Sequence, residues 1–122
     1  MITEDYVSYE VAKLLNEKGF EILTDKVYDN QNKLDYQNVV CWLEKRLPYI
    51  SAPTHQMVMK WLREEKKIYI RIIEDAFGEN YHFEIYSKNP NIKMNYYVPN
   101  YYESTYEDAV ESALKYVLVN LI

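Results

Sequence analysis

Residues 53–86 read PTHQMVMKWLREEKKIYIRIIEDAFGENYHFEIY, and this stretch predicts a helix followed by a β-hairpin. Pro53 and Thr54 are typical of a helix start. Proline restricts the backbone conformation of the chain that enters the helix, and a threonine hydroxyl can accept a hydrogen bond from a free backbone N–H. The apolar side chains then recur at the spacing of one helix face, namely Met57, Val58, Trp61 and Leu62. We therefore expect an amphipathic helix over residues 54–66.

The hairpin is indicated by two runs, 68–73 and 81–86, in which apolar side chains alternate with other side chains as in strands that bury one face. Residues 75–80 connect the runs, and Gly78 can adopt the positive φ that a tight connection needs. The apolar side chains of the two strands lie on the same face only when the numbers of the paired residues add up to an odd number. The register that we predict pairs Ile70 with Ile85, Ile72 with Phe83, and Arg71 with Glu84.

Outward from this stretch, the chain predicts a helix at each end. Ser8 is a suitable N-cap for a helix over residues 8–18, and Gly19 stands where a left-handed residue ends a helix. Thr105 and Asp108 resemble a capping box, followed by a broad apolar face that runs nearly to residue 122. Between these helices we expect a strand at 21–28, a polar turn at 29–33 and a short strand at 94–98.

Residues 36–47 fit two structures. Their apolar positions match a helical stripe that Pro48 would end, whereas the run Val39–Trp42 also suits a buried strand. We favour the helix and leave the strand open.

These elements predict an α+β fold, with two or three helices packed on one face of a small antiparallel sheet. The length of 122 residues fits a single domain over residues 1–122. The core that we expect consists of Val11, Leu14, Leu15, Phe20, Val58, Trp61, Leu62, Ile70, Ile72, Phe83, Ile85, Val110, Leu114, Val117 and Leu118.

Composition narrows the classes of function. The net charge is −5, with −3 over residues 1–52, +3 over residues 53–73 and −5 over residues 74–122. An acidic chain repels duplex DNA on average, so nucleic-acid binding is not favoured. The acidic, polar start has no signal-peptide pattern, and no apolar run approaches the length of a membrane span. We expect a cytoplasmic protein with no membrane partner.

Motifs for catalysis or metal binding are not found. One cysteine, Cys41, excludes an internal disulfide framework, and two distant glycines exclude a glycine-rich phosphate loop. His55 and His82 match no standard ligand spacing, and we expect His55 in a solvated first helical turn and His82 on the outer face of the hairpin. A Cys41–His55 nucleophile pair is less favoured than a buried, inert thiol. We therefore expect a non-enzyme without catalytic, cofactor or metal sites.

Two features could form an interaction surface. Tyrosine is abundant, with 14 residues, and we predict a partner-binding or self-associating edge at Tyr96, Tyr97, Tyr101 and Tyr102. The alternative is that these rings cover the core. A basic stripe consists of Lys60, Arg63 and Lys67, and Arg71 can extend it. It is either a solvated helix face or a phosphate-facing surface.

Three stretches of the chain are similar to sequences of known proteins, namely YISAPTHQMVMKWLREEKKIYIRI, DYVSYEVAKLLNEKGF and YESTYEDAVESALKYVLVNLI. They resemble a family of small uncharacterised proteins of gut-type bacteria, their phages and mobile elements. The shared signature is an APT turn before a KWLRE helix, a hairpin and a final helix with a YEDA-type start. The resemblance implies a common fold, and it brings no established activity and no catalytic residues.

Overall fold

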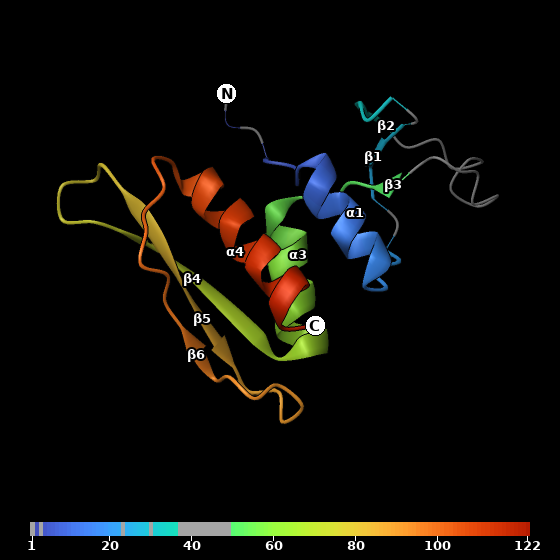
Figure 1. Ribbon diagram of the computed structural model, residues 1–122. Helices are drawn as coiled ribbons and strands as arrows, with labels where there is room; N and C mark the ends of the chain where they lie inside the picture. The colour runs from blue at the N-terminus through green and yellow to red at the C-terminus, as the bar shows by residue number, and fades with distance from the viewer. Residues whose placement is uncertain (1, 3, 23, 30, 37–49) are drawn as a thin grey trace. The chain divides into compact units, whose positions relative to one another are not determined.

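The protein is described by a computed structural model, which covers residues 2, 4–22, 24–29, 31–36 and 50–122 (Figure 1). The chain divides into two compact units, Met1–Thr54 and His55–Ile122. The expectation of a single domain over residues 1–122 stays a prediction. Of the predicted helix or strand at 36–47, only Tyr36 is described, and it is the last residue of a strand. Residues 37–47, with Cys41 among them, lie outside the described residues.

The first unit contains helix α1 (Tyr9–Glu17) and a three-stranded antiparallel sheet. The strands are β1 (Lys26–Tyr28), β2 (Leu34–Tyr36) and β3 (Ile50–Ser51), in the order β2-β1-β3. The predicted helix ends are confirmed. Ser8 accepts a hydrogen bond from the backbone N–H of Val11, and Gly19 has a φ of +86°.

Strand β1 is shorter than the strand expected over residues 21–28. The chain bends at Asp25, immediately before the strand, and the Thr24 hydroxyl donates to the carbonyl oxygen of Lys26 at 2.6 Å. The polar turn that follows is confirmed. Asp29 accepts from the backbone N–H groups of Lys33 and Gln31, and these hydrogen bonds lower the pKa of its carboxyl group.

The second unit contains helix α3 (His55–Trp61), a π-helical turn η1 (Leu62–Lys66), strands β4 (Ile68–Glu74), β5 (Tyr81–Ser87) and β6 (Tyr96–Tyr97), and helix α4 (Tyr106–Asn120). The predicted helix over 54–66 therefore ends in a π-helical turn. Lys67, with a left-handed φ of 56°, closes this turn and leads into β4.

The hairpin register is confirmed at all three predicted positions, Ile70 with Ile85, Ile72 with Phe83, and Arg71 with Glu84. Strand β6 pairs with the other side of β5, which gives a second three-stranded sheet in the order β4-β5-β6. Thr105 caps α4 by accepting from the N–H of Asp108 at 3.1 Å. Helix α4 lies against β4 and β5 (Figure 1).

The α+β class is thus confirmed, although the described strands form two small sheets where we expected one. The sequence pattern does not show this second sheet, because β1 pairs with the distant Ile50 and Ser51.

Most of the predicted core is buried, but Leu14, Ile70 and Ile72 are only half-buried. Ile70 and Ile72 face the helices from an edge strand, so they have sheet neighbours on one side only. The prediction also missed several buried apolar residues, among them Val7, Ala12, Val27, Met59 and Ile68. In the described part of the chain, no helix is long and apolar enough to cross a membrane.

Candidate interaction surface

The sheet of the second unit has two chemically different faces. Ile68, Phe83, Ile85 and Ser87 are buried on the face toward α4. The alternate residues project on the opposite face, because successive side chains of a strand point to opposite sides. We call this opposite face, formed by Tyr69, Arg71, Glu84, Tyr86 and Tyr96, the outer sheet face.

Glu84 is the centre of a hydrogen-bond cluster on the outer sheet face. Its carboxylate accepts from Arg71 Nη2 at 2.5 Å, from the Tyr86 hydroxyl at 2.8 Å and from the Tyr96 hydroxyl at 3.2 Å. The Tyr86 and Tyr96 rings lie 5.0 Å apart, measured between centroids. Three donors from three strands therefore hold one carboxylate in place.

The cluster shifts the pKa values of its members. The hydrogen bond from Tyr86, and then those from Arg71 and Tyr96, lower the pKa of Glu84, so Glu84 is ionised near neutral pH. The same carboxylate raises the pKa of Tyr86, and burial together with Glu84 raises the pKa of Tyr96. Both hydroxyls thus stay protonated and act as donors.

Two further contacts extend the outer sheet face. The Lys88 ammonium lies 5.1 Å from the centroid of the Tyr69 ring. His82, on the outer side as predicted, has its ring 5.5 Å from that of Tyr102 in an edge-to-face contact. The described residues offer the buried Nδ1 atom of His82 no hydrogen-bond partner.

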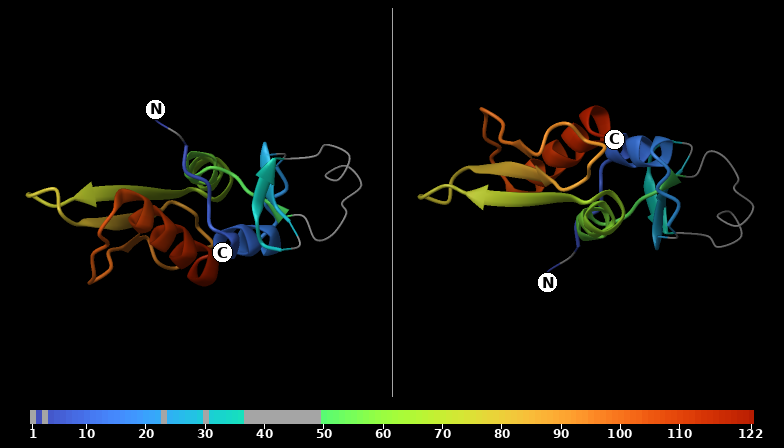
Figure 2. Two further views of the ribbon diagram at one scale, coloured as in Figure 1. Left: turned by 90° about the horizontal axis from the view of Figure 1, so that it is seen from above. Right: turned by 90° about the horizontal axis from the view of Figure 1, so that it is seen from below.

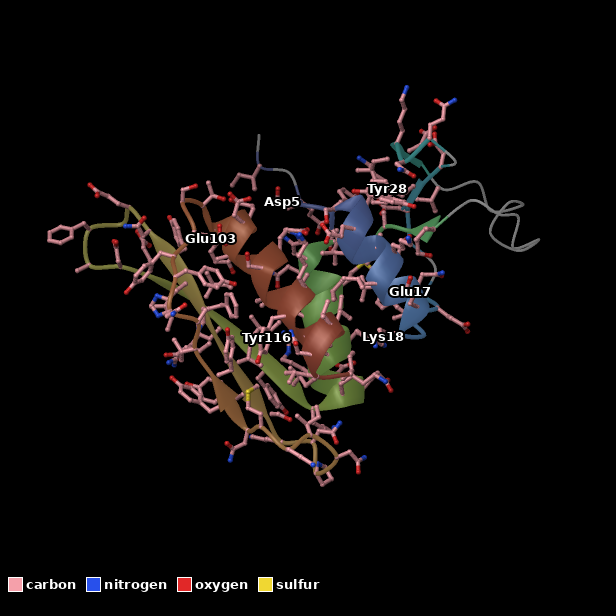
Figure 3. All side chains as sticks on the ribbon, in the orientation of Figure 1. Asp5, Glu17, Lys18, Tyr28, Glu103 and Tyr116 are labelled. Carbon is pink, nitrogen blue, oxygen red and sulfur yellow. The ribbon has the colours of Figure 1, made fainter. Side chains whose placement is uncertain are left out.

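The four predicted tyrosines separate into two groups. Tyr96 and Tyr102 are 48% and 63% exposed and lie on the outer side of the sheet. Tyr97 instead stacks on Tyr116 of α4, with ring centroids 3.9 Å apart and planes inclined by 6°. Figure 3 labels Tyr116 on α4. Tyr101 is exposed, but its ring lies 6.3 Å from that of the buried Phe83.

Tyr97 therefore packs against α4 and helps to cover the core, as in the alternative interpretation of the tyrosine-rich segment. We leave Tyr97 and Tyr101 out of the candidate surface, because their replacement would also disturb the packing around Phe83 and Tyr116. Tyr96 and Tyr102 remain in it.

The predicted basic residues are also divided by the structure. Lys60, Arg63 and Lys67 are exposed on α3, on η1 and at the residue that ends it. Arg71 lies on β4 and is paired with Glu84 on the outer sheet face. Its charge is therefore largely compensated within the hairpin.

His55 departs from the prediction of a solvated position. It is buried, and its Nε2 atom lies 2.8 Å from Oε1 of Glu111 on α4. Sequence patterns could not show this contact, because the two residues are 56 positions apart. The pair connects α3 with α4 inside the second unit and lies away from the outer sheet face.

Among the described residues, no three His, Cys, Asp or Glu side chains come together as a group that could hold a metal ion. Comparisons of the chain with protein-family models, curated proteins and solved structures return no match. The family resemblance in the sequence therefore stays a prediction.

The cluster around Glu84 predicts an acid-sensitive fold. Because the folded state lowers the pKa of Glu84 from its usual 4.5, its contribution to stability is present above this value and is lost as pH falls through the lower, folded pKa. We expect Glu84→Gln to be less stable than the parent chain at pH 7, and the difference to shrink as the pH falls below the usual glutamate pKa of 4.5. Urea unfolding across this pH range measures it. A constant difference across the range would contradict the role of the ionised carboxylate.

Proposed function

We propose that this chain is a non-catalytic interaction protein that binds a protein partner through the outer sheet face. The observation that carries the proposal is the exposure of two tyrosines on one side of the sheet, Tyr96 beside the ordered Arg71–Glu84 pair and Tyr102 beside His82. Tyrosine and arginine are enriched at the centres of protein interfaces, because they bring large contact areas and hydrogen-bonding tips. A tyrosine side chain also loses little conformational freedom when it is fixed.

The charge of the outer sheet face supports a protein partner over a nucleic acid. Glu84 is ionised and holds Arg71, so this face offers a phosphate backbone no unpaired arginine and one fixed negative charge. The chain as a whole carries −5. Nucleic-acid binding would therefore have to use the basic residues on α3 and η1, which is the second possibility that the experiment below distinguishes.

The wider context of the proposal comes from the sequence. The APT-to-KWLRE signature suggests a small accessory protein of bacteria, phages or mobile elements. The single cysteine fits a reducing compartment such as the cytoplasm. We found no motif of nucleophile, glycine-rich loop or metal ligands in the chain, which supports a role without catalysis.

The experiment is an affinity capture from a lysate of the native host, with and without nuclease, using three forms of the chain. The double variant Tyr96→Ser with Tyr102→Ser should lose the specific protein partner. Tyr106→Ser is the matched control, because Tyr106 is an exposed tyrosine whose ring contacts Tyr81 instead of the outer sheet face. The control should retain the partner, and nuclease should have no effect.

The opposite result would replace the proposal by its alternative. Captured material that disappears after nuclease treatment, that depends steeply on salt and that requires Lys60 and Arg63 would indicate a nucleic-acid-binding protein. Partners that survive the double variant would also contradict the assignment to the outer sheet face.

A further inference from the structure

The two edges of the β4-β5-β6 sheet differ in a way that points to self-association. Strand β6 has two residues and is followed by Val98 and the buried Pro99, so this edge is short. Strand β4 has seven residues and pairs with β5 along its whole length without a bulge. In both views of Figure 2 it runs along the margin of the sheet, and within the described residues β5 is the only strand paired with it.

The hydrogen bonds at the two ends of the hairpin show which backbone groups face the open edge. The N–H of Lys88 donates to the carbonyl oxygen of Lys67, and the N–H of Asp75 donates to that of Asn80. Directly opposed residues alternate between hydrogen-bonded and non-hydrogen-bonded pairs in an antiparallel ladder. The odd-numbered residues of β4 therefore bond to β5, and the backbone groups of Ile68, Ile70, Ile72 and Glu74 point away from it.

Two side chains along this edge are large and apolar, as is usual in a strand with neighbours on both sides. Ile70 and Ile72 point toward the helix-covered face and yet are only half-buried. Natural edge strands usually carry a lysine, a proline, a bulge or an inward-pointing charge that discourages pairing. Strand β4 has no lysine, proline or bulge, and its one basic residue, Arg71, projects on the outer face and is bound to Glu84. Its one charge on the helix-facing side is Glu74, which is exposed at the last position of the strand.

We infer that the open edge of β4 pairs antiparallel with β4 of a second copy of this chain, around a two-fold axis at Ile70. Antiparallel pairing of identical strands is self-complementary, so the assembly closes as a dimer. It joins two three-stranded sheets into one continuous sheet. The inference goes beyond the proposed partner binding, because it uses the strand edge and the proposed function uses the sheet face.

Charge argues against the two neighbouring registers, which have their two-fold axes at Arg71 and at Tyr69. A two-fold axis at Ile70 places Arg71 opposite Tyr69 of the second copy, where the guanidinium can lie over the ring. An axis at Arg71 would place the Arg71 residues of the two copies opposite each other. An axis at Tyr69 would place Arg71 of one copy opposite Lys67 of the other. Like charges directly opposite each other are destabilising.

The first experiment measures the oligomeric state by sedimentation from micromolar to millimolar concentration. We expect a reversible dimer, and Ile70→Lys should weaken it by about tenfold or more, because this places a charge on the helix-facing side of the paired edge. Val98→Lys, which adds the same charge beside the opposite edge of the sheet at an exposed apolar residue, is the matched control and should leave the dimer unchanged. A monomer at every concentration, or a folded Ile70→Lys variant that dimerises normally, would overturn the inference.

The second experiment tests the register without a disruptive substitution. In a chain that carries Cys41→Ser, Ile70→Cys should form a disulfide-linked dimer on mild oxidation, because opposed Cα atoms of a hydrogen-bonded pair lie about 5.5 Å apart. Ile72→Cys should not do so, because its two copies would lie four residues out of register, or about 13 Å. Equal cross-linking of the two variants, or none at Ile70, would contradict the proposed axis.

Discussion

Replacing Trp61 with alanine is expected to lower the free energy of unfolding by about 3–5 kcal/mol, the usual cost of removing a large buried aromatic side chain. Trp61 is the last residue of α3 and is buried together with Val58 and Leu62 in the second unit. The ammonium group of Lys66 lies 5.4 Å from the centroid of its ring. Because domains of this size are stable by only about 5–15 kcal/mol, the variant should melt far below the parent chain.

Lys60→Ala is the matched control for this prediction. Lys60 precedes Trp61 on the same helix but is exposed, so its replacement should change the free energy of unfolding by only a few tenths of a kcal/mol. Urea unfolding of both variants makes the comparison. Equal stability of Trp61→Ala and Lys60→Ala would show that the apolar side of α3 does not form part of the core.

The hairpin could be predicted in detail because its information is local. Alternating side chains identified both strands, and the requirement that Ile72 and Phe83 share a face restricted their register. Helix ends were likewise predictable from single residues such as Ser8 and Thr105, because an N-cap acts on N–H groups within three positions of itself.

Other features depend on contacts that no short pattern contains. Nothing near Ile70 or Ile72 in the sequence shows that β4 lies at an edge, so both were expected to be fully buried. The contact of His55 with Glu111 joins two distant helices. The π-helical turn after Trp61 also breaks a regular apolar stripe that by itself favours an uninterrupted helix.

The candidate surface was predictable in composition but not in arrangement. The tyrosine-rich segment was evident, yet its division depends on which residues pair with β5. Because Tyr97 lies opposite Ile85 and Tyr96 opposite Tyr86, the first ring turns toward α4 and the second toward the outer sheet face. The role of Glu84 as the common acceptor follows from the same pairing and from no sequence motif.

Replacing Phe83 with alanine is the second large effect that we expect, again with a loss of about 3–5 kcal/mol in the free energy of unfolding. Phe83 is fully buried, with an exposed fraction of 0%, at the middle of the central strand β5. Its ring lies 6.1 Å from that of Tyr97, which in turn stacks on Tyr116. The cavity should therefore loosen the contact between β6 and α4 in addition to removing apolar contacts.

The same hairpin supplies an identical substitution as the control. Phe77, in the connection between β4 and β5, is 86% exposed, so Phe77→Ala should change the free energy of unfolding by less than about 0.5 kcal/mol. Denaturant unfolding gives the stability of both variants, and amide hydrogen exchange at Tyr97 and at residues of α4 reports the local loosening. Faster exchange at α4 in Phe83→Ala than in Phe77→Ala is the expected result. A Phe83→Ala variant with unchanged stability would mean that the face of β5 toward α4 is not packed, which would contradict the position assigned to the whole sheet in the second unit.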